Sequence, residues 1–375
     1  MHILIGADLV PTESNQDLFQ AGDARSLLGD DLQSLLAAAD YRIFNLEVPL
    51  TDLETPIKKC GPNLIAPAAS VAGYKAIGAN ILTLANNHIL DQGAQGLQST
   101  CSVLKENGIA YLGVGDTPEQ AAAPYIFTFA SKRIGIYACA EHEFSIVTAH
   151  SAGANPFDPL ESPDHIQALK AQCDYVIVLY HGGKEHYRYP SPGLQKVCRK
   201  LVEKGADLVV CQHSHCIGCE EKYLHGTIVY GQGNFLFDHS TSEFWKTSLL
   251  IRLENDLTVS YIPLEKNGNG VRLADEKAAA TIMDQFLERS RRIQEKDAVA
   301  QEYAAFTKTV EKAYYARLLG RRSFVIKVLN KLSGGKLLTR RINRSYPAQE
   351  KLNVQNCVAC EAHRELLLNV LDDSG

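Results

Sequence analysis

The chain has 375 residues, of which 45% are hydrophobic, and it carries a formal net charge of −5 at pH 7. This composition indicates a soluble globular protein with a large core and about two domains, and the mild acidity offers no general attraction to nucleic acid or to membranes. No positively charged leader precedes the first apolar run, no apolar run approaches the ~20 residues of a membrane span, and the ten cysteines are scattered through core-like positions. We therefore expect a cytoplasmic protein with free thiols and no transmembrane segment.

Short apolar runs and helix-periodic segments alternate along most of the chain. The expected order is strand 2–5, helix 17–39, strand 41–47, helix 71–77, strand 80–84, helix 93–107 and strand 109–114. It continues with a hairpin over 125–129 and 133–139, helix 164–171, strand 174–180, helix 194–204, a strand from residue 206 toward His213, strand 227–230, and a final hairpin over 247–253 and 257–263. This alternation predicts a layered α/β fold in which helices cover the faces of a sheet.

Beyond residue 270 the pattern changes to helical spacing alone. We place a boundary in the polar stretch 267–270, which gives a first domain over residues 1–270 and a helical region over residues 271–375. Basic residues cluster in that region, namely Arg289, Arg291, Arg292, Arg317, Arg321, Arg322, Lys327, Lys331, Lys336, Arg340, Arg341 and Arg344. They indicate a solvated helical face or a binding surface, and the solvated face is the favoured interpretation.

Five expected strands end in residues that can bind a metal ion. These residues are Asp8, Glu47, Asn87, His181 and the pair His213 and His215. Because ligands of an open α/β sheet bind at the carboxyl ends of its strands, we expect these side chains to meet in one place. Each has an ordinary interpretation when taken alone, as a turn residue, a loop charge or a packed histidine, but chance explains the whole set poorly.

The donor set combines two carboxylates, one amide oxygen and three imidazoles. Such a mixed set suits manganese, iron, zinc or magnesium better than it suits a structural zinc site made of thiolates. Six ligands are many for one catalytic ion and natural for two ions that share a carboxylate, so we expect one or two divalent metal ions. Two-metal sites activate a bridging water and hold phosphoryl oxygens during in-line displacement.

Six segments, taken in order, form a specific pattern. They are residues 6–8 (GAD), 45–47 (NLE), 85–88 (ANNH), 181–183 (HGG), 213–215 (HSH) and 231–238 (GQGNFLFD). Over about residues 1–265 the pattern resembles the CapA family, which comprises proteins of bacterial capsule and poly-γ-glutamate synthesis within the calcineurin-like metallophosphoesterase superfamily. The resemblance implies a two-sheet β-sandwich flanked by helices, with the metal ions at one edge.

The resemblance also implies a role for each metal ligand. Asp8 and His215 would bind the first ion, Asn87, His181 and His213 would bind the second, and Glu47 would bridge the two. The superfamily usually has a histidine where this chain has Val10, and an aspartate where it has Glu47. Because Val10 supplies no ligand, we expect the first ion to bind more weakly than the second.

Three further residues are expected around the metal ions. His88 would act as a general acid or as a hydrogen-bond donor to phosphoryl oxygens, while Asn234 and Arg188 are candidate substrate-binding residues. The resemblance thus implies a metal-dependent, phosphoesterase-like hydrolase that acts on a phosphorylated small molecule or polymer precursor in or near the synthesis of capsule, poly-γ-glutamate or another surface polymer. The alternative is a non-catalytic, metal-binding accessory or scaffold subunit. Other polymer-synthesis proteins are expected partners, and nucleic acid is not.

Overall fold

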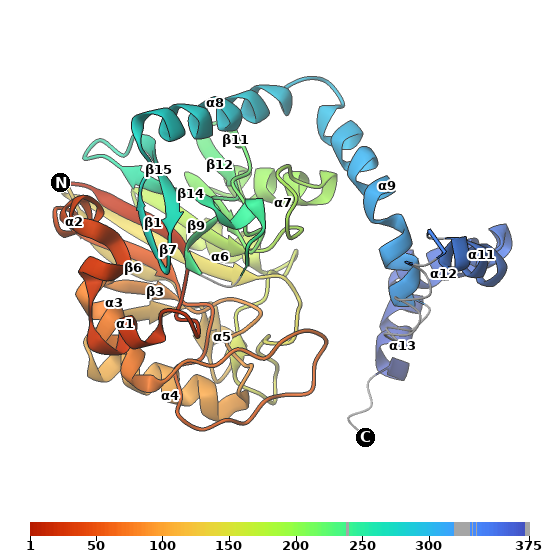
Figure 1. Ribbon diagram of the computed structural model, residues 1–375, viewed down its shortest axis with the longest axis horizontal. Coiled ribbons are helices and arrows are strands. Elements are labelled where there is room, and N and C mark those ends of the chain that lie inside the picture. The colour runs from red at the N-terminus through yellow and green to blue at the C-terminus, as the bar shows by residue number, and fades with distance from the viewer. Residues whose placement is uncertain (238–239, 319–330, 332, 335, 372–375) are drawn as a thin grey trace. The chain divides into compact units, whose positions relative to one another are not determined.

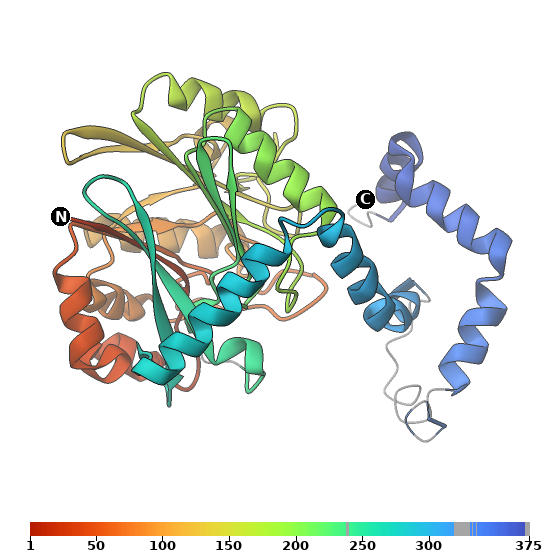
Figure 2. The same cartoon turned by 90° about the horizontal axis from the view of Figure 1, so that it is seen from above.

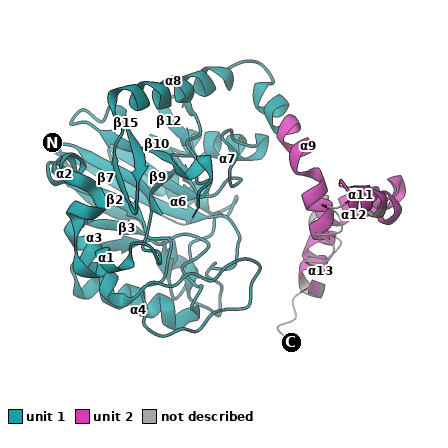
Figure 3. Cartoon of the chain, in the orientation of Figure 1, with its two compact units in different colours: residues 1–303 teal, residues 304–375 magenta. Residues whose placement is uncertain are grey.

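The computed structural model describes residues 1–237, 240–318, 331, 333–334 and 336–371. The chain divides into two compact units, Met1–Tyr303 and Ala304–Gly375, which Figure 3 colours separately. All described strands belong to the first unit, and the elements described in the second unit are helices. The candidate site residues, from Asp8 to Asn234, all lie in the first unit.

The larger sheet of the first unit has eight strands. Its parallel part runs from β1 (Ile3–Val10) through β2 (Tyr41–Asn45) and β3 (Ile81–Thr83) to β4 (Ala110–Leu112). On the other side of β1 lie the antiparallel strands β14 (Thr247–Leu253), β15 (Val259–Asn267) and β16 (Gly270–Leu273). A short strand, β13 (Asn234–Phe237), pairs with the last residues of β1.

The second sheet has six strands, in the order β11 (Glu220–Tyr223), β12 (Gly226–Tyr230), β10 (Leu208–Gln212), β9 (Tyr175–His181), β7 (Lys132–Ala140) and β6 (Tyr125–Phe129). Its four central strands are parallel, and their near-continuous apolar sequences suit burial on both faces. Side chains from the two sheets share one core, in which Ile43 and Ile81 lie with Ile136, Ile177 and Val210. The expected two-sheet sandwich is thus confirmed.

Helices cover the outer faces of both sheets (Figures 1 and 2). On the larger sheet these are α1 (Gln16–Ala21), α2 (Ala24–Ala37), α3 (Val71–Ile77) and α4 (Gly93–Glu106). On the second sheet they are α6 (Ser162–Lys170) and α7 (Pro192–Glu203). The short elements α5 (Pro118–Ala121), β5 (Val114–Gly115) and β8 (Gly153–Ala154) lie in the connections between these layers.

Two expected elements are interrupted at glycines. The helix expected over residues 17–39 is divided into α1 and α2, because Gly22 takes a left-handed φ of 66° that ends α1, and the Asp23 side chain then caps α2 by accepting a hydrogen bond from Ser26 N. A second break follows at Gly29, whose φ of 72° kinks α2. The strand expected over residues 109–114 is divided into β4 and β5 at Gly113, where φ is 86°. A Cβ atom at Gly113 would lie 2.7 Å from Ala85 Cβ, so this position requires glycine.

The first unit extends past the boundary expected at residues 267–270. These residues form the turn of a β-hairpin, because β15 and β16 pair from Leu264 and Leu273 to Asn267 and Gly270. The next helix, α8 (Glu276–Arg292), packs Ile282 and Phe286 against apolar side chains of the first unit. The compact unit therefore continues to Tyr303.

The second unit has the expected helical character. Its helices are α9 (Ala298–Leu318), which begins in the first unit, α11 (Lys336–Ser345), α12 (Ala348–Ala359) and α13 (Glu361–Leu371). Three members of the basic cluster, Arg321, Arg322 and Lys327, lie outside the described residues. None of the described helices combines the length and the apolarity needed to cross a bilayer. All ten cysteines are described, and each is free.

Candidate metal centre

The six predicted metal ligands lie together where strands of the two sheets end. Asp8 is in β1 itself, whereas Glu47 and Asn87 follow β2 and β3 in the larger sheet. His181 is the last residue of β9, and the segment with His213 and His215 follows β10 in the second sheet. The parallel direction of the strands within each sheet brings these chain segments to the same edge. All six residues are buried.

His181 lies at the centre of one half of this cluster. Its Nε2 atom is 3.0 Å from Asn87 Oδ1, 3.1 Å from His213 Nδ1 and 3.2 Å from Glu47 Oε1. Its other ring nitrogen, Nδ1, is 3.2 Å from Asn45 Nδ2. The residues assigned to the second ion by resemblance therefore surround a single point.

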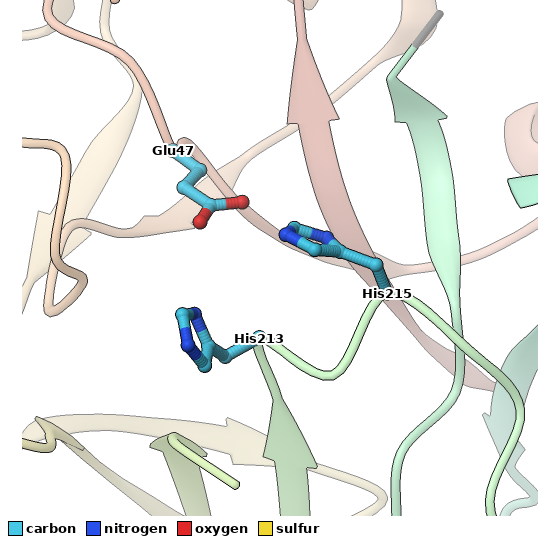
Figure 4. A group of neighbouring side chains, drawn as sticks. All are labelled: Glu47, His213 and His215. Carbon is cyan, nitrogen blue, oxygen red and sulfur yellow. The ribbon is translucent and has the colours of Figure 1, made fainter. Parts of the chain in front are cut away.

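His215 connects the other half. Its Nδ1 atom is 2.9 Å from Asn234 Oδ1 and 3.4 Å from Asp8 Oδ2. Glu47, His213 and His215 each offer one ligand atom, and these three atoms lie within 4.8 Å of one another (Figure 4). Glu47 thus faces both halves, as its expected bridging role requires.

The surroundings of Glu47 fit a bound cation. Glu47 is completely buried. His181 Nε2 approaches its Oε1 at 3.2 Å, but neither carboxylate oxygen accepts a well-aligned hydrogen bond from any described residue. A buried carboxylate without well-aligned donors is costly, whereas coordination to a metal ion satisfies it. In addition, three atoms with lone pairs crowd around His181 Nε2 at 3.0–3.2 Å, although a single N–H can serve one acceptor at a time. A divalent cation among these atoms would satisfy all of them.

The histidines of the cluster differ in charge. Burial, together with the nearby His181 and His215, lowers the pKa of His213 well below its usual range, so His213 is neutral and has a lone pair to offer. Burial also acts to lower the pKa of His215, but the hydrogen bond to Asp8 and the charge of Glu47 outweigh it and raise that pKa to about 9. The same contact with His215 outweighs burial at Asp8 and lowers the pKa of Asp8. In the metal-free state His215 and Asp8 therefore form an ion pair.

The turn after β10 holds its two histidines in unusual backbone conformations. His213 has φ of 76° and His215 has φ of 53°, in the left-handed region that residues other than glycine seldom occupy. Such a conformation costs on the order of 1–3 kcal/mol and persists where the surrounding structure enforces it. Gln212 contributes to that enforcement, because its Nε2 donates a hydrogen bond to Gly6 O of β1 at 3.3 Å. The turn therefore carries the histidines from the second sheet toward β1.

Behind His88 lies a buried pair that sequence reasoning missed. His88 Nδ1 is 2.6 Å from Asp91 Oδ2 and 3.2 Å from Lys59 Nζ, and Lys59 forms an ion pair with Asp91. The side chains of Asp91 and Lys59 are 0% and 1% exposed, whereas that of His88 is 13% exposed. With Nδ1 held on this side, the free ring nitrogen of His88 is Nε2. His88 directly follows Asn87, a member of the cluster, so its backbone lies beside the cluster.

Of the two candidate substrate-binding residues, Asn234 contacts the cluster directly, whereas the contacts of Arg188 are with other residues. Asn234 belongs to the cluster through His215, and its buried Nδ2 has no hydrogen-bond partner among the described residues. The Arg188 guanidinium instead donates to Ile217 O at 3.1 Å and lies over the Phe244 ring at 4.8 Å. Val10 is buried among the apolar side chains beneath the helices of the larger sheet, and so it supplies no ligand.

Comparison with known sequences shows a clear relationship. A family model described as "Bacterial capsule synthesis protein PGA_cap" matches residues 3–239. "Capsule biosynthesis protein CapA" of Bacillus anthracis is 30% identical over 212 residues, which make up 54% of this chain and 52% of that protein. "PGA biosynthesis protein CapA" of Bacillus subtilis is 26% identical over 245 residues, or 64% of this chain and 61% of that protein. The chain thus spans about half to three fifths of the length of these relatives.

A third relative and two solved structures are also similar to this chain. A "probable polyglutamine synthesis accessory protein" of Mycobacterium tuberculosis is 29% identical over 216 residues, or 54% of this chain and 57% of that protein. A "novel phosphatase" of Mycoplasma pneumoniae has a TM-score of 0.45 at 13% identity and covers 71% of this chain and 94% of its own. A "putative 5'-nucleotidase" of Staphylococcus aureus has a TM-score of 0.43 at 13% identity and covers 76% and 58%. Such distant structural likenesses carry no information about substrate or activity.

Proposed function

Because the chain belongs to the bacterial capsule synthesis protein family, we propose that it is a metal-dependent phosphoesterase in or near the synthesis of capsule, poly-γ-glutamate or another surface polymer. Its substrate is a phosphorylated small molecule or polymer precursor, its partners are other proteins of polymer synthesis, and it acts in the cytoplasm. The observation that carries the metal dependence is the completely buried Glu47 carboxylate, which accepts no hydrogen bond from the described residues.

The proposal assigns the ligands to two ions of unequal affinity. One ion takes Asn87, His181 and His213, whose donor atoms converge. The other takes Asp8 and His215, and Glu47 bridges both. Manganese, iron, zinc and magnesium all accept such mixed oxygen and nitrogen donors. A bound divalent ion would supply charge stabilisation for phosphoryl oxygens and would lower the pKa of a water molecule.

Two side chains of the protein act on the substrate in this proposal. His88, held by the hydrogen bond that its Nδ1 donates to Asp91, uses its free Nε2 to donate a proton to the leaving oxygen of the phosphoester. Asn234 uses its unpaired Nδ2 to donate a hydrogen bond to a phosphoryl oxygen. Arg188 stays a candidate substrate-binding residue, because its hydrogen bond to Ile217 O uses one of the five N–H groups of the guanidinium.

A second candidate function is a non-catalytic accessory subunit that retains the metal ions for structure or binding. The name of the Mycobacterium tuberculosis relative, a synthesis accessory protein, favours this candidate. Both candidates require metal at Glu47, and they differ in turnover.

The deciding experiment combines elemental analysis with a substrate screen. Protein purified without chelator is assayed against a panel of phosphomonoesters and phosphodiesters, with Glu47→Gln as the metal-deficient control. Turnover by the wild type that is absent in the control supports the phosphoesterase. Bound metal without turnover of any phosphoester supports the accessory subunit, and absence of metal contradicts both.

A further inference from the structure

The second unit has a charge opposite to that of the rest of the chain. Residues 304–375 contain thirteen Lys and Arg and six Asp and Glu, which gives a net charge of +7 in a chain whose total is −5, and the positive charge is concentrated in residues 308–351. In α11 the basic side chains of Lys336, Arg340 and Arg344 are all exposed. They are spaced four residues apart, and so they form a stripe along one face of the helix.

The same unit exposes large apolar side chains. Leu337 of α11 is 47% exposed, and Leu366, Leu368 and Leu371 of α13 are 65%, 62% and 68% exposed. Among the described residues of this unit, Ile342 is the sole hydrophobic side chain that is buried. A segment of this length normally needs a shared apolar core to be stable. Its exposed leucines therefore call for a partner surface.

We propose that the second unit binds the surface of a membrane that contains anionic phospholipids. Leucines of α11 and α13 enter the boundary between headgroups and acyl chains, while the Lys and Arg side chains contact lipid phosphates. Binding is peripheral, because none of the described helices can cross a bilayer. The inference rests on the second unit alone and is independent of the chemistry at Glu47.

Positive charge together with exposed leucines favours an anionic membrane over the other possible partners. A second copy of the same unit would bring two net charges of +7 together, which opposes self-association. Nucleic acid would pair with the Lys and Arg side chains but would leave the leucines exposed to water. An anionic lipid surface accommodates both. The exposed leucines are also the reason to set aside the solvated helical face that the basic sequence alone favours.

The test is flotation of the full chain with lipid vesicles at ~0.1 M salt. One vesicle preparation is pure phosphatidylcholine, and the other contains roughly 30% phosphatidylglycerol. The first variant combines Lys336→Gln, Arg340→Gln and Arg344→Gln, and the second combines Leu366→Ser, Leu368→Ser and Leu371→Ser. The matched control combines Arg25→Gln, Lys75→Gln and Lys200→Gln, which replace exposed basic residues of the first unit.

The wild type should float with the anionic vesicles and not with the neutral ones. Each removed charge should weaken binding about fivefold, so the basic variant should lose binding more than tenfold, and the leucine variant should lose about as much. The control should bind within twofold of the wild type. Unchanged circular dichroism would show that the variants are folded.

Three results would overturn the proposal. The first is failure of the wild type to float, or equal flotation with neutral vesicles. The second is a leucine variant that binds as well as the wild type, especially if duplex DNA competes for the wild type, because binding would then be to polyanions in general. The third is a leucine variant that changes the oligomeric state without changing flotation, because the leucines would then lie between copies of the chain.

Discussion

His181 Nε2 lies 3.2 Å from Glu47 Oε1, although the two residues come from different sheets of the sandwich. This contact does not have the geometry of a hydrogen bond, neither carboxylate oxygen accepts one from the described residues, and the same ring nitrogen also faces Asn87 and His213. The arrangement of these atoms fits the coordination of a cation better than it fits hydrogen bonding among the side chains. The predictions about the metal centre follow from this relationship.

In the metal-free protein, Glu47→Gln should change stability little. The substitution removes the desolvation cost of a buried charge, but it also removes the attraction of that charge for the nearby His181 and His215. The free energy of unfolding should therefore change by less than about 1 kcal/mol in the presence of chelator. Thermal or urea denaturation measures the change. The matched control is Glu221→Gln, because Glu221 is also buried but is paired with Arg199 and accepts a hydrogen bond from Tyr230. This control should lose on the order of 3 kcal/mol, because it breaks a buried ion pair, and an equal loss in both variants would contradict the expectation for Glu47.

The two metal ions should bind with different affinities. Val10 supplies no ligand to the ion held by Asp8 and His215, whereas Asn87, His181 and His213 converge. Calorimetric titration of the metal-free protein should therefore show one tight site and one weak site. Asp8→Asn should remove the weak site and His213→Ala the tight one. Two equal, tight sites in the wild type would show that another group replaces the absent histidine.

If His88 protonates the leaving group, His88→Ala should lower kcat for alkyl phosphates by roughly 10²–10⁴-fold. An activated aryl phosphate should be affected much less, because its leaving group needs no proton. Metal content should not change, since His88 is not a ligand in this account. Steady-state kinetics with both substrates gives the comparison. Loss of metal in this variant would identify His88 as a ligand instead.

The buried partners of His88 should affect catalysis through its orientation. Asp91→Asn should lower kcat for alkyl phosphates and leave the aryl phosphate nearly unchanged, because the hydrogen bond to His88 Nδ1 would be weakened. Lys59→Met should act in the same direction. Rates that fall equally for both substrates would indicate a general structural role. The ratio of the two kcat values, not either value alone, is the relevant measurement.

Gly218, which follows the histidine turn, should not tolerate a side chain. A Cβ atom there would lie 1.7 Å from Tyr230 O, a backbone atom of β12 that cannot move away cheaply. Gly218→Ala should cost about 3 kcal/mol or more in unfolding free energy. At Gly193 in α7 the nearest atom to a new Cβ is 3.8 Å away, so Gly193→Ala should be neutral or slightly stabilising. Similar stability of the two variants would show that the turn is less tightly packed than described.

The cluster of candidate ligands could be predicted from sequence because these residues lie near the ends of apolar strands, and parallel strands end at the same edge. Glu47 just after β2 and His181 at the end of β9 illustrate this rule, whereas Asp8 lies within β1. The role of Lys59 could not be recognised, because it lies in an irregular loop and reaches Asp91 by tertiary packing alone. The contacts of Arg188 could not be predicted for the same reason, because its guanidinium meets Ile217 and Phe244 through tertiary packing.

The boundaries of the elements were predicted from the sequence less well than their order along the chain. A polar, glycine-containing stretch at residues 267–270 indicates a domain boundary, but the same residues also suit the turn of a β-hairpin, which is what β15 and β16 form. Local sequence does not distinguish these cases, because the pairing partner decides between them. Likewise, helical spacing continues through Gly22, and a left-handed φ ends α1 there.

The most direct test of the central claim is the metal content of the full chain, purified without chelator, in the wild type and in Glu47→Gln. The account predicts one to two equivalents of a divalent metal in the wild type and a nearly metal-free variant that remains folded. Equal metal content in the two proteins, or a folded wild type that takes up no metal even when titrated, would contradict it.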